Sequence, residues 1–265
     1  MIFFVLTVIF VIGLFFGSFL NVIVDRQQRK ETVLTGRSYC EFCKKELKWY
    51  DLIPIFSFLF LRGKCRYCHK KLSLYYPLTE LSTAVLFTIT YAFLNFQPVF
   101  NSLIANPLPL IYYLFLSSSF IVIVFSDLKY NIIPDKIVIP AIIISFLYLL
   151  IVNPPLLVSY LLSALGSFAF FLMLFLITKG KGMGFGDVKL SFLLGLVLGF
   201  PKIILALYLA FLTGAAIGII LILWKKKRTI KDTIPFGPFL ILGTLVSLFL
   251  GELIIPKITT FLGLL

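Results

Sequence analysis

Long stretches without a charged residue limit what this chain can fold into. They run from 2 to 24, 81 to 126, 137 to 178, 203 to 224 and 233 to 251. A helix needs roughly 20 apolar residues to cross the hydrocarbon core of a bilayer, and each stretch provides about that many or more. Since 60% of the 265 residues are hydrophobic and 13% are charged, the sequence predicts an all-α polytopic membrane protein.

Two of these stretches are long enough for two crossings each. The segment from Asn95 to Pro109 contains three prolines, and VNPP occupies 152 to 155, so we expect the chain to turn back at both places. A shorter span fits between Gly186 and Pro201. The sequence therefore predicts about eight transmembrane helices. The expected domains are a first helix over 1–24, a cytoplasmic loop over 25–74 and a seven-helix membrane domain over 75–265.

The basic residues fall mainly in alternate loops, which predicts the side of the membrane that each loop occupies. With both termini outside, twenty-two of the twenty-four Lys and Arg residues are cytoplasmic, and only Lys202 and Lys257 are outside. The first segment lacks a basic beginning and a small-residue cleavage site, so it is expected to remain as an anchor. The basic residues that set this topology therefore account for most of the net charge of +13. The KKKR run at 225 to 228 is expected to meet anionic membrane lipids, and no nucleic-acid partner is expected.

All four cysteines lie in the predicted cytoplasmic loop, in two Cys-x-x-Cys pairs. Cys40 and Cys43 form one pair, and Cys65 and Cys68 form the other. Two thiolates from one tight turn can occupy adjacent corners of a tetrahedron, and two such pairs complete the four-sulfur shell that zinc favours. Disulfides are the alternative, but a cytoplasmic loop is in a reducing compartment. The sequence therefore predicts a structural zinc site without an open coordination position.

The single histidine, His69, excludes several kinds of active site. It follows Cys68 directly and could replace one thiolate, but we expect it to be exposed beside the zinc site. The sequence has no His-Glu-x-x-His zinc protease motif, and a Ser-His-Asp triad would have to recruit this histidine from the zinc loop. The glycines from 180 to 186 lack the Gly-Lys-Ser/Thr ending of a phosphate-binding loop. Acidic residues are the remaining candidates for chemistry.

Four of the eleven acidic residues lie at the cytoplasmic edges of predicted spans: Glu80, Asp127, Asp135 and Asp187. An ionisable group in or near a span is a functional candidate because its burial is costly. Of two facing carboxylates, one can keep a proton and polarise a peptide carbonyl while the other takes a proton from a water between them. Alternatively, Asp187 only caps its helix, and the glycines before it form a flexible turn. The pattern alone leaves this choice open.

Seven segments in order resemble the type IV prepilin peptidases, which belong to the wider Gly-x-Gly-Asp intramembrane aspartyl proteases. The segments are FGSFLNVIVDR at 16–26, YCEFC at 39–43, LKWYDLIPIFSFLFLRGKCRYC at 47–68, YPLTEL at 76–81, SDLKYNIIPD at 126–135, GMGFGDVKL at 182–190 and IPFGPFLILG at 234–243.

The resemblance implies an inner-membrane endopeptidase whose catalytic aspartates match Asp127 and Asp187. Members cut the basic leader from type IV prepilins and pseudopilins on the cytoplasmic side. They then N-methylate the new terminal residue, with S-adenosylmethionine as methyl donor. The resemblance also associates the four-cysteine loop with zinc. Asp25 departs from the neutral or aromatic residue that is common at its position, which affects how the leader would be received and not the catalytic residues.

Several neighbouring charges keep two interpretations each. Lys189 could steady ionised Asp187 or extend toward the headgroups. Asp135 is expected to cap a helix or to support a loop, and Glu80 to bind a positively charged substrate end or pair with a loop lysine. The prolines on either side of Gly237 should loosen the start of the last span and leave backbone carbonyls free, which could help an extended substrate strand bind beside the aspartates or could simply kink the helix.

Small residues four apart predict close contacts between helices. The pairs are Gly13 with Gly17, Gly195 with Gly199, and Gly214 with Gly218.

Two other classes of protein fit parts of the pattern. A transporter can carry acids within its spans, but it would normally show related halves and interrupted helices at mid-membrane. A non-enzymatic assembly factor for pili or secretion could use the zinc loop to dock a partner, and its aspartates would be dispensable. The sequence sets neither the oligomeric state nor the position of a methyl-donor site.

Overall fold

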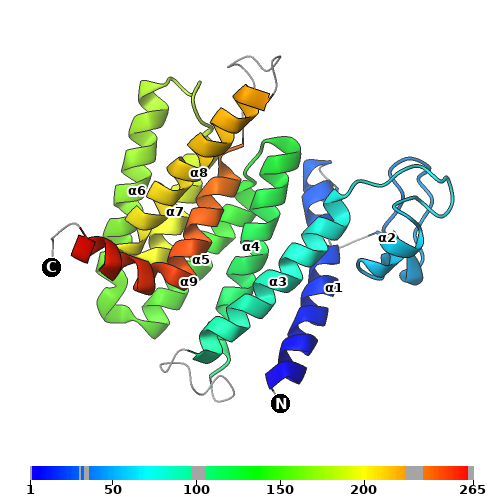
Figure 1. Ribbon diagram of the computed structural model, residues 1–265, viewed down its shortest axis with the longest axis horizontal. Coiled ribbons are helices and arrows are strands. Elements are labelled where there is room, and N and C mark those ends of the chain that lie inside the picture. The colour runs from blue at the N-terminus through cyan, green and yellow to red at the C-terminus, as the bar shows by residue number, and fades with distance from the viewer. Residues whose placement is uncertain (1, 30, 33–35, 97–105, 225–234, 262–265) are drawn as a thin grey trace. The chain divides into compact units, whose positions relative to one another are not determined.

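The computed structural model describes residues 2–29, 31–32, 36–96, 106–224 and 235–261, and these are almost entirely helical (Figure 1). Among these described residues, extended backbone pairs only at two isolated β-bridges. The helices are α1 (Ile2–Gln28), η1 (Trp49–Leu52), α2 (Phe56–Phe60), α3 (Tyr75–Phe96), α4 (Leu108–Tyr130), α5 (Asp135–Val152), η3 (Pro154–Leu156), α6 (Leu157–Ile177), α7 (Phe185–Leu198), α8 (Lys202–Trp224) and α9 (Gly237–Phe261).

Seven helices in the described part of the chain are long and apolar enough to cross a membrane, so the chain is a multi-pass membrane protein. The seven helices are α1, α3, α4, α5, α6, α8 and α9. The predicted all-α polytopic class is confirmed. The expected eighth span is α7, which has only 14 residues and is about 21 Å long, shorter than a hydrocarbon core of roughly 30 Å.

The predicted turn at VNPP is confirmed, because α5 ends at Val152 and η3 leads directly into α6. The turn expected between Asn95 and Pro109 falls mostly on residues 97–105, and the KKKR run on 225–234. Both segments lie outside the described residues.

The chain forms two compact units, Met1–Phe125 and Ser126–Leu265. In the first, α1 and α3 pack closely at two glycines. A Cβ atom at Gly13 would lie 2.6 Å from Ala84 Cα, and one at Gly17 would lie 2.6 Å from Glu80 Cα. Only glycine allows the two backbones to approach this closely, so the close contact expected for this pair is confirmed.

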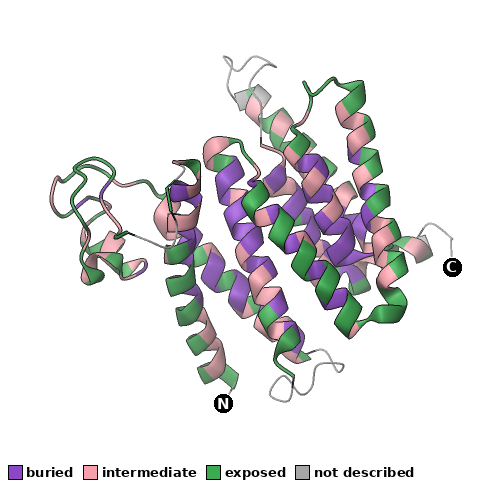
Figure 2. Cartoon of the chain, turned by 180° about the vertical axis from the view of Figure 1, so that it is seen from behind, coloured by how far each residue is buried: buried purple, intermediate pink, exposed green. Residues whose placement is uncertain are grey.

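In the second unit, α7 packs against α5, α6, α8 and α9. Ten of its residues are buried, and Figure 2 shows buried residues concentrated where helices face one another. Because its neighbours cover it, α7 does not need the length of a lipid-exposed span.

The other two glycine pairs behave differently from the first. A Cβ atom at Gly195 would lie 2.5 Å from Ala164 Cα, so this residue packs α7 against α6 as expected. Its predicted partner Gly199 has φ +65° and ends α7 instead. A Cβ atom at Gly214 would meet the Phe236 ring at 3.3 Å. Gly243, which the spacing did not single out, packs against the Ala206 carbonyl.

Candidate functional site

The four cysteines gather into one cluster in the first unit. The sulfur atoms of Cys40, Cys43, Cys65 and Cys68 all lie within 4.8 Å of one another. Their spacing in space fits a single ion with four sulfur ligands, and four thiolates are a donor set that suits zinc. The cluster can therefore hold a metal ion.

Each Cys-x-x-Cys pair sits on a turn of the same design. The first cysteine of the pair both donates a backbone hydrogen bond to a residue five positions later and accepts one from a residue four positions later. These bonds are Cys40 N to Lys45 O (3.0 Å), Lys44 N to Cys40 O (2.8 Å), Cys65 N to Lys70 O (2.9 Å) and His69 N to Cys65 O (3.0 Å). The repeated geometry presents two sulfurs from each turn toward the other turn.

The residue after each pair adopts a left-handed backbone conformation. Lys44 has φ +57° and His69 has φ +56°, an uncommon region for residues other than glycine. His69 is exposed, as predicted.

The thiols of the cluster differ in acidity. Burial raises the pKa of Cys40 to about 11. Burial also opposes ionisation of Cys65, but backbone hydrogen bonds from Cys68 and Tyr67 outweigh it and lower the pKa of Cys65 to about 7. The fold therefore favours the thiolate form at Cys65 over Cys40.

Asp51, in η1, ties the second cysteine turn to the rest of the loop. Its carboxylate accepts hydrogen bonds from Arg66 Nε (2.6 Å), from the Tyr67 hydroxyl (3.1 Å) and from the Lys48 backbone N–H (3.2 Å). Burial opposes ionisation of this carboxyl, but these hydrogen bonds outweigh it and hold its pKa below the usual range.

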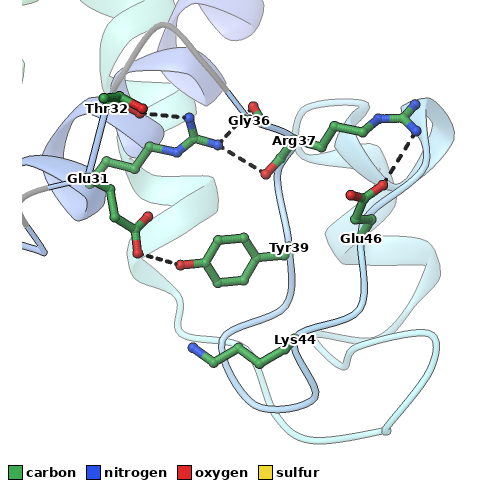
Figure 3. A pocket seen from close by; sticks show the side chains of 8 residues that line it. Glu31, Thr32, Gly36, Arg37, Tyr39, Lys44 and Glu46 are labelled. Carbon is green, nitrogen blue, oxygen red and sulfur yellow. Dashed lines mark hydrogen bonds and ion pairs between the residues drawn. The ribbon is translucent and has the colours of Figure 1, made fainter.

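A pocket of about 490 Å³ opens in the same loop (Figure 3). Its lining groups are already engaged with one another: Arg26 donates to three backbone carbonyls, the Tyr39 hydroxyl donates to Glu31, and Arg37 pairs with Glu46. Arg26 thus fixes the chain where it leaves α1. The lining is charged, unlike the apolar lining of most small-molecule sites.

The two aspartates singled out by the sequence lie in the second unit and are both buried. Asp127, near the end of α4, is 5% exposed, and Asp187, in the first turn of α7, is 6% exposed. Their carboxylates are close enough for their charges to interact. Sixty positions separate them in the sequence, so the packing of the unit brings them together.

Asp127 is held by the start of the last helix. Its Oδ2 accepts a hydrogen bond from the Gly237 backbone N–H at 2.9 Å. A Cβ atom at position 237 would lie 2.7 Å from that oxygen, so glycine is needed for the approach. The sequence predicted free carbonyls here, but the free group is an N–H, because the first N–H groups of a helix have no partner within it.

Asp187 uses one oxygen to cap its own helix. Its Oδ2 accepts a hydrogen bond from the Gly184 N–H at 3.1 Å, as the capping interpretation predicted. Its Oδ1 is buried and has no hydrogen-bond partner among the described residues. A buried polar atom without a partner is costly, so this oxygen is available for a water or a substrate.

Ile133 connects the surroundings of the two aspartates. A Cβ atom at Gly186 would lie 2.8 Å from Ile133 Cβ, and one at Gly237 would lie 3.5 Å from Ile133 Cδ1. The residue before Asp187 and the residue bonded to Asp127 therefore pack on the same side chain. The sequence did not predict that Ile133 or Gly237 contacts the aspartate site. The Pro-Phe-Gly-Pro segment at 235–238 does, however, signal an unpaired N–H at a helix start.

The charges around the aspartates differ from the predictions. Lys189 forms an ion pair with Asp135 rather than with Asp187. Asp135 is the first residue of α5, whose cap residue is Pro134, and through Lys189 it links α5 to α7.

Glu80, in the first unit, forms no ion pair with a lysine in the described part of the loop, and its expected role toward a substrate end stays a prediction. It accepts a hydrogen bond from the Ile55 backbone N–H at 2.8 Å.

Comparison with known proteins identifies the family. The bacterial peptidase A24 N-terminal domain matches residues 11–94, and the type IV leader peptidase family matches residues 114–219. A Bacillus subtilis (strain 168) protein named prepilin leader peptidase/N-methyltransferase is 32% identical over 252 residues, covering 94% of this chain and 96% of its own. The chain belongs to the type IV leader peptidase family.

Other relatives of the same name extend the family match. The protein of Aeromonas hydrophila is 31% identical, over 93% of this chain and 91% of its own. That of Legionella pneumophila is 32% identical, over 92% of each. No solved structure matches. The four cysteines fall in the N-terminal domain match and both aspartates in the leader peptidase match, whereas Gly237 lies beyond both.

Proposed function

We propose that the protein is an aspartyl endopeptidase that removes the leader from type IV prepilins and pseudopilins and then N-methylates the new terminal residue. The observation that carries the proposal is the pair of buried aspartates, Asp127 and Asp187, in one interacting site. The names of the relatives supply the substrate class and the second activity.

In the proposed hydrolysis, each aspartate is positioned by one oxygen and reacts through the other. The Oδ2 atoms of Asp127 and Asp187 accept backbone N–H groups, from Gly237 and Gly184. Their Oδ1 atoms remain for a water and a shared proton, because two adjacent carboxylates do not easily ionise together.

The peptide bond is then broken by addition of this water. The ionised aspartate removes a proton from the water as its oxygen attacks the carbonyl carbon, and the protonated aspartate donates to the carbonyl oxygen. When the intermediate collapses, the carbon–nitrogen bond breaks and the nitrogen takes up a proton. The leader leaves with a new carboxyl group, and the pilin keeps a new amine.

S-adenosylmethionine would supply the methyl group that this amine receives. Zinc would be held by Cys40, Cys43, Cys65 and Cys68. Four sulfur ligands leave no open position for a substrate, so its role would be to stabilise the loop. The distribution of Lys and Arg supports an inner-membrane location, with the loop and the active site on the cytoplasmic side.

Mass spectrometry of a prepilin incubated with the purified protein tests this function. With S-adenosylmethionine present, we expect a product shortened at the leader junction and heavier by one methyl group at its new terminus. Without the methyl donor, the product should be shortened and unmethylated. An intact prepilin in both reactions would reject the peptidase and favour a transporter or an assembly factor.

A further inference from the structure

The short helix α2 has an exposed apolar face in the cysteine loop. Phe56, Leu59 and Phe60 are 58%, 64% and 83% exposed. Their spacing of three and four residues places them on one side of the helix. Phe58 lies on another side and packs onto the turn at Gly63, where a Cβ atom would lie 3.0 Å from its ring. The loop therefore presents three large side chains outward and packs the fourth.

Contacts with α1 and α3 hold the start of α2 beside the middle part of α1, before its charged C-terminal end. The Ile55 N–H donates to Glu80 Oε2 at 2.8 Å, and Ser18 of α1 also bonds the Glu80 carboxyl. The first charged residue of α1 is Asp25, seven residues after Ser18 and hence about 10 Å further along the helix axis. The apolar face thus begins at a depth where α1 is still uncharged and where Glu80 is the one charged residue of α3.

The backbone at this contact is strained. Ile55 has φ +60° and ψ −50°, and the Phe56 N–H donates to the Pro54 carbonyl at 2.6 Å. This is a γ-turn of the rare strained type, at a β-branched residue. Strained backbone persists only where surrounding contacts fix it, and the bond to Glu80 provides such a contact.

The charges around α2 suit an anionic surface. Exposed Lys48, Arg62 and Lys64 flank the helix, and positions 52–79 contain no acidic residue. Lys and Arg next to an apolar helix face are typical of segments that bind at the surface of anionic membranes.

We propose that α2 lies in the membrane interface, with Phe56, Leu59 and Phe60 at the boundary between headgroups and acyl chains. The loop is connected at both ends to membrane-spanning helices. Its attachment point, Glu80, is buried within α3, which is itself one of the membrane-spanning helices. The cysteine cluster is thereby held at a fixed height above the bilayer.

Tryptophan fluorescence tests this placement in the full chain. The two tryptophans, Trp49 and Trp224, are replaced by Phe, and Phe60→Trp then provides the only indole. The variant is reconstituted in vesicles of phosphatidylcholine and phosphatidylglycerol. Phosphatidylcholine brominated near the headgroup end of its acyl chains should quench more than half of the emission, and aqueous iodide should quench little.

Phe42→Trp in the same background is the matched control. Phe42 is also exposed in the cysteine loop, but its neighbour Glu41 bonds Arg29, beyond the end of α1. Iodide should quench this probe more strongly than it quenches Phe60→Trp. Metal content reports that the loop is folded in each variant, and Phe56→Trp replaces Phe60→Trp if that variant fails to assemble.

Two outcomes would overturn the proposal. Equal quenching of both probes by iodide, without quenching by brominated lipid, would place α2 in water. A probe on α2 shielded from both quenchers would place it against protein, either a second copy or another partner. Neither outcome depends on peptidase activity.

Discussion

The cysteine cluster and the aspartate pair both join residues that are distant in sequence, but they are assembled differently. The cysteines come from two local turns of the same design, and each turn carries two ligands. The aspartates come from separate helices and are positioned by backbone N–H groups at Gly184 and Gly237. We infer that a metal ion completes the first site, whereas close helix packing completes the second.

The largest expected effect comes from the aspartates themselves. Asp127→Asn or Asp187→Asn should lower prepilin cleavage by at least about 10²–10⁴-fold, because an amide cannot take a proton from water. The metal content should stay unchanged, because the cysteine cluster is built separately. Asp135→Asn is the matched control, since Asp135 pairs with Lys189, and it should retain cleavage when rates are measured by mass spectrometry. Substantial cleavage by either of the first two variants would remove that aspartate from the mechanism.

Loss of a sulfur ligand should affect the other region. Cys40→Ser should lower the bound zinc and expose the loop to added protease, because metal binding and folding of such a loop are coupled. Elemental analysis and limited proteolysis measure both effects. A loop that stays protected with its zinc lost would show that the metal does not stabilise it. If cleavage persists while methylation ends, the loop belongs to the second activity.

Gly237→Ala should show how closely the aspartate site depends on packing. The added Cβ would lie 2.7 Å from Asp127 Oδ2, so the carboxylate or α9 must move, and misplacement on this scale can lower the rate by about 10²-fold. Gly166→Ala is the control, because a Cβ there meets nothing within 4 Å. Equal cleavage rates in the two variants would mean that the Gly237 contact does not position Asp127.

Asp51→Asn should weaken the loop by about 1.5–3 kcal/mol, the range for hydrogen bonds to a charged group. The pKa of Asp51 is held below its usual value, so its contribution is present above about pH 4 and is lost only as the pH falls through the folded-state value. The difference in amide exchange between wild type and variant should therefore stay constant from pH 7 to 5. A difference that shrinks over this range would contradict the assignment.

The smallest effect is expected at Lys189. Because it pairs with a partly exposed Asp135, Lys189→Met should change stability by no more than about 1 kcal/mol and leave the cleavage rate nearly unchanged. A tenfold loss of cleavage, measured alongside unchanged thermal stability, would show that Lys189 acts on Asp187 after all.

The two regions also differ in how far the sequence predicts them. Composition and charge-free length predicted the membrane helices, and the Cys-x-x-Cys spacing predicted the cysteine cluster, because both are local patterns. The pairing of Asp127 with Asp187 needed the family resemblance, since Glu80 and Asp135 fitted the pattern equally well.

Long-range contacts explain the missed features. The Gly237 N–H meets Asp127 across 110 positions, Lys189 reaches Asp135 across 54, and Glu80 is bonded by a backbone group of the loop. The sequence predicted α7 as a span shorter than the others, but it gave no reason for that length: the apolar residues of α7 are buried by other helices rather than by lipid. Hydrophobicity alone does not separate these two environments.

A double-substitution cycle tests the central claim, that Asp127 and Asp187 act as one catalytic unit, most directly. Residual prepilin cleavage is measured for Asp127→Asn, for Asp187→Asn and for the two together. Residues that act as a unit are strongly non-additive, so we predict that the double variant is no slower than the slower single variant. Losses that multiply would show that the two carboxylates act independently and would contradict a shared water and proton.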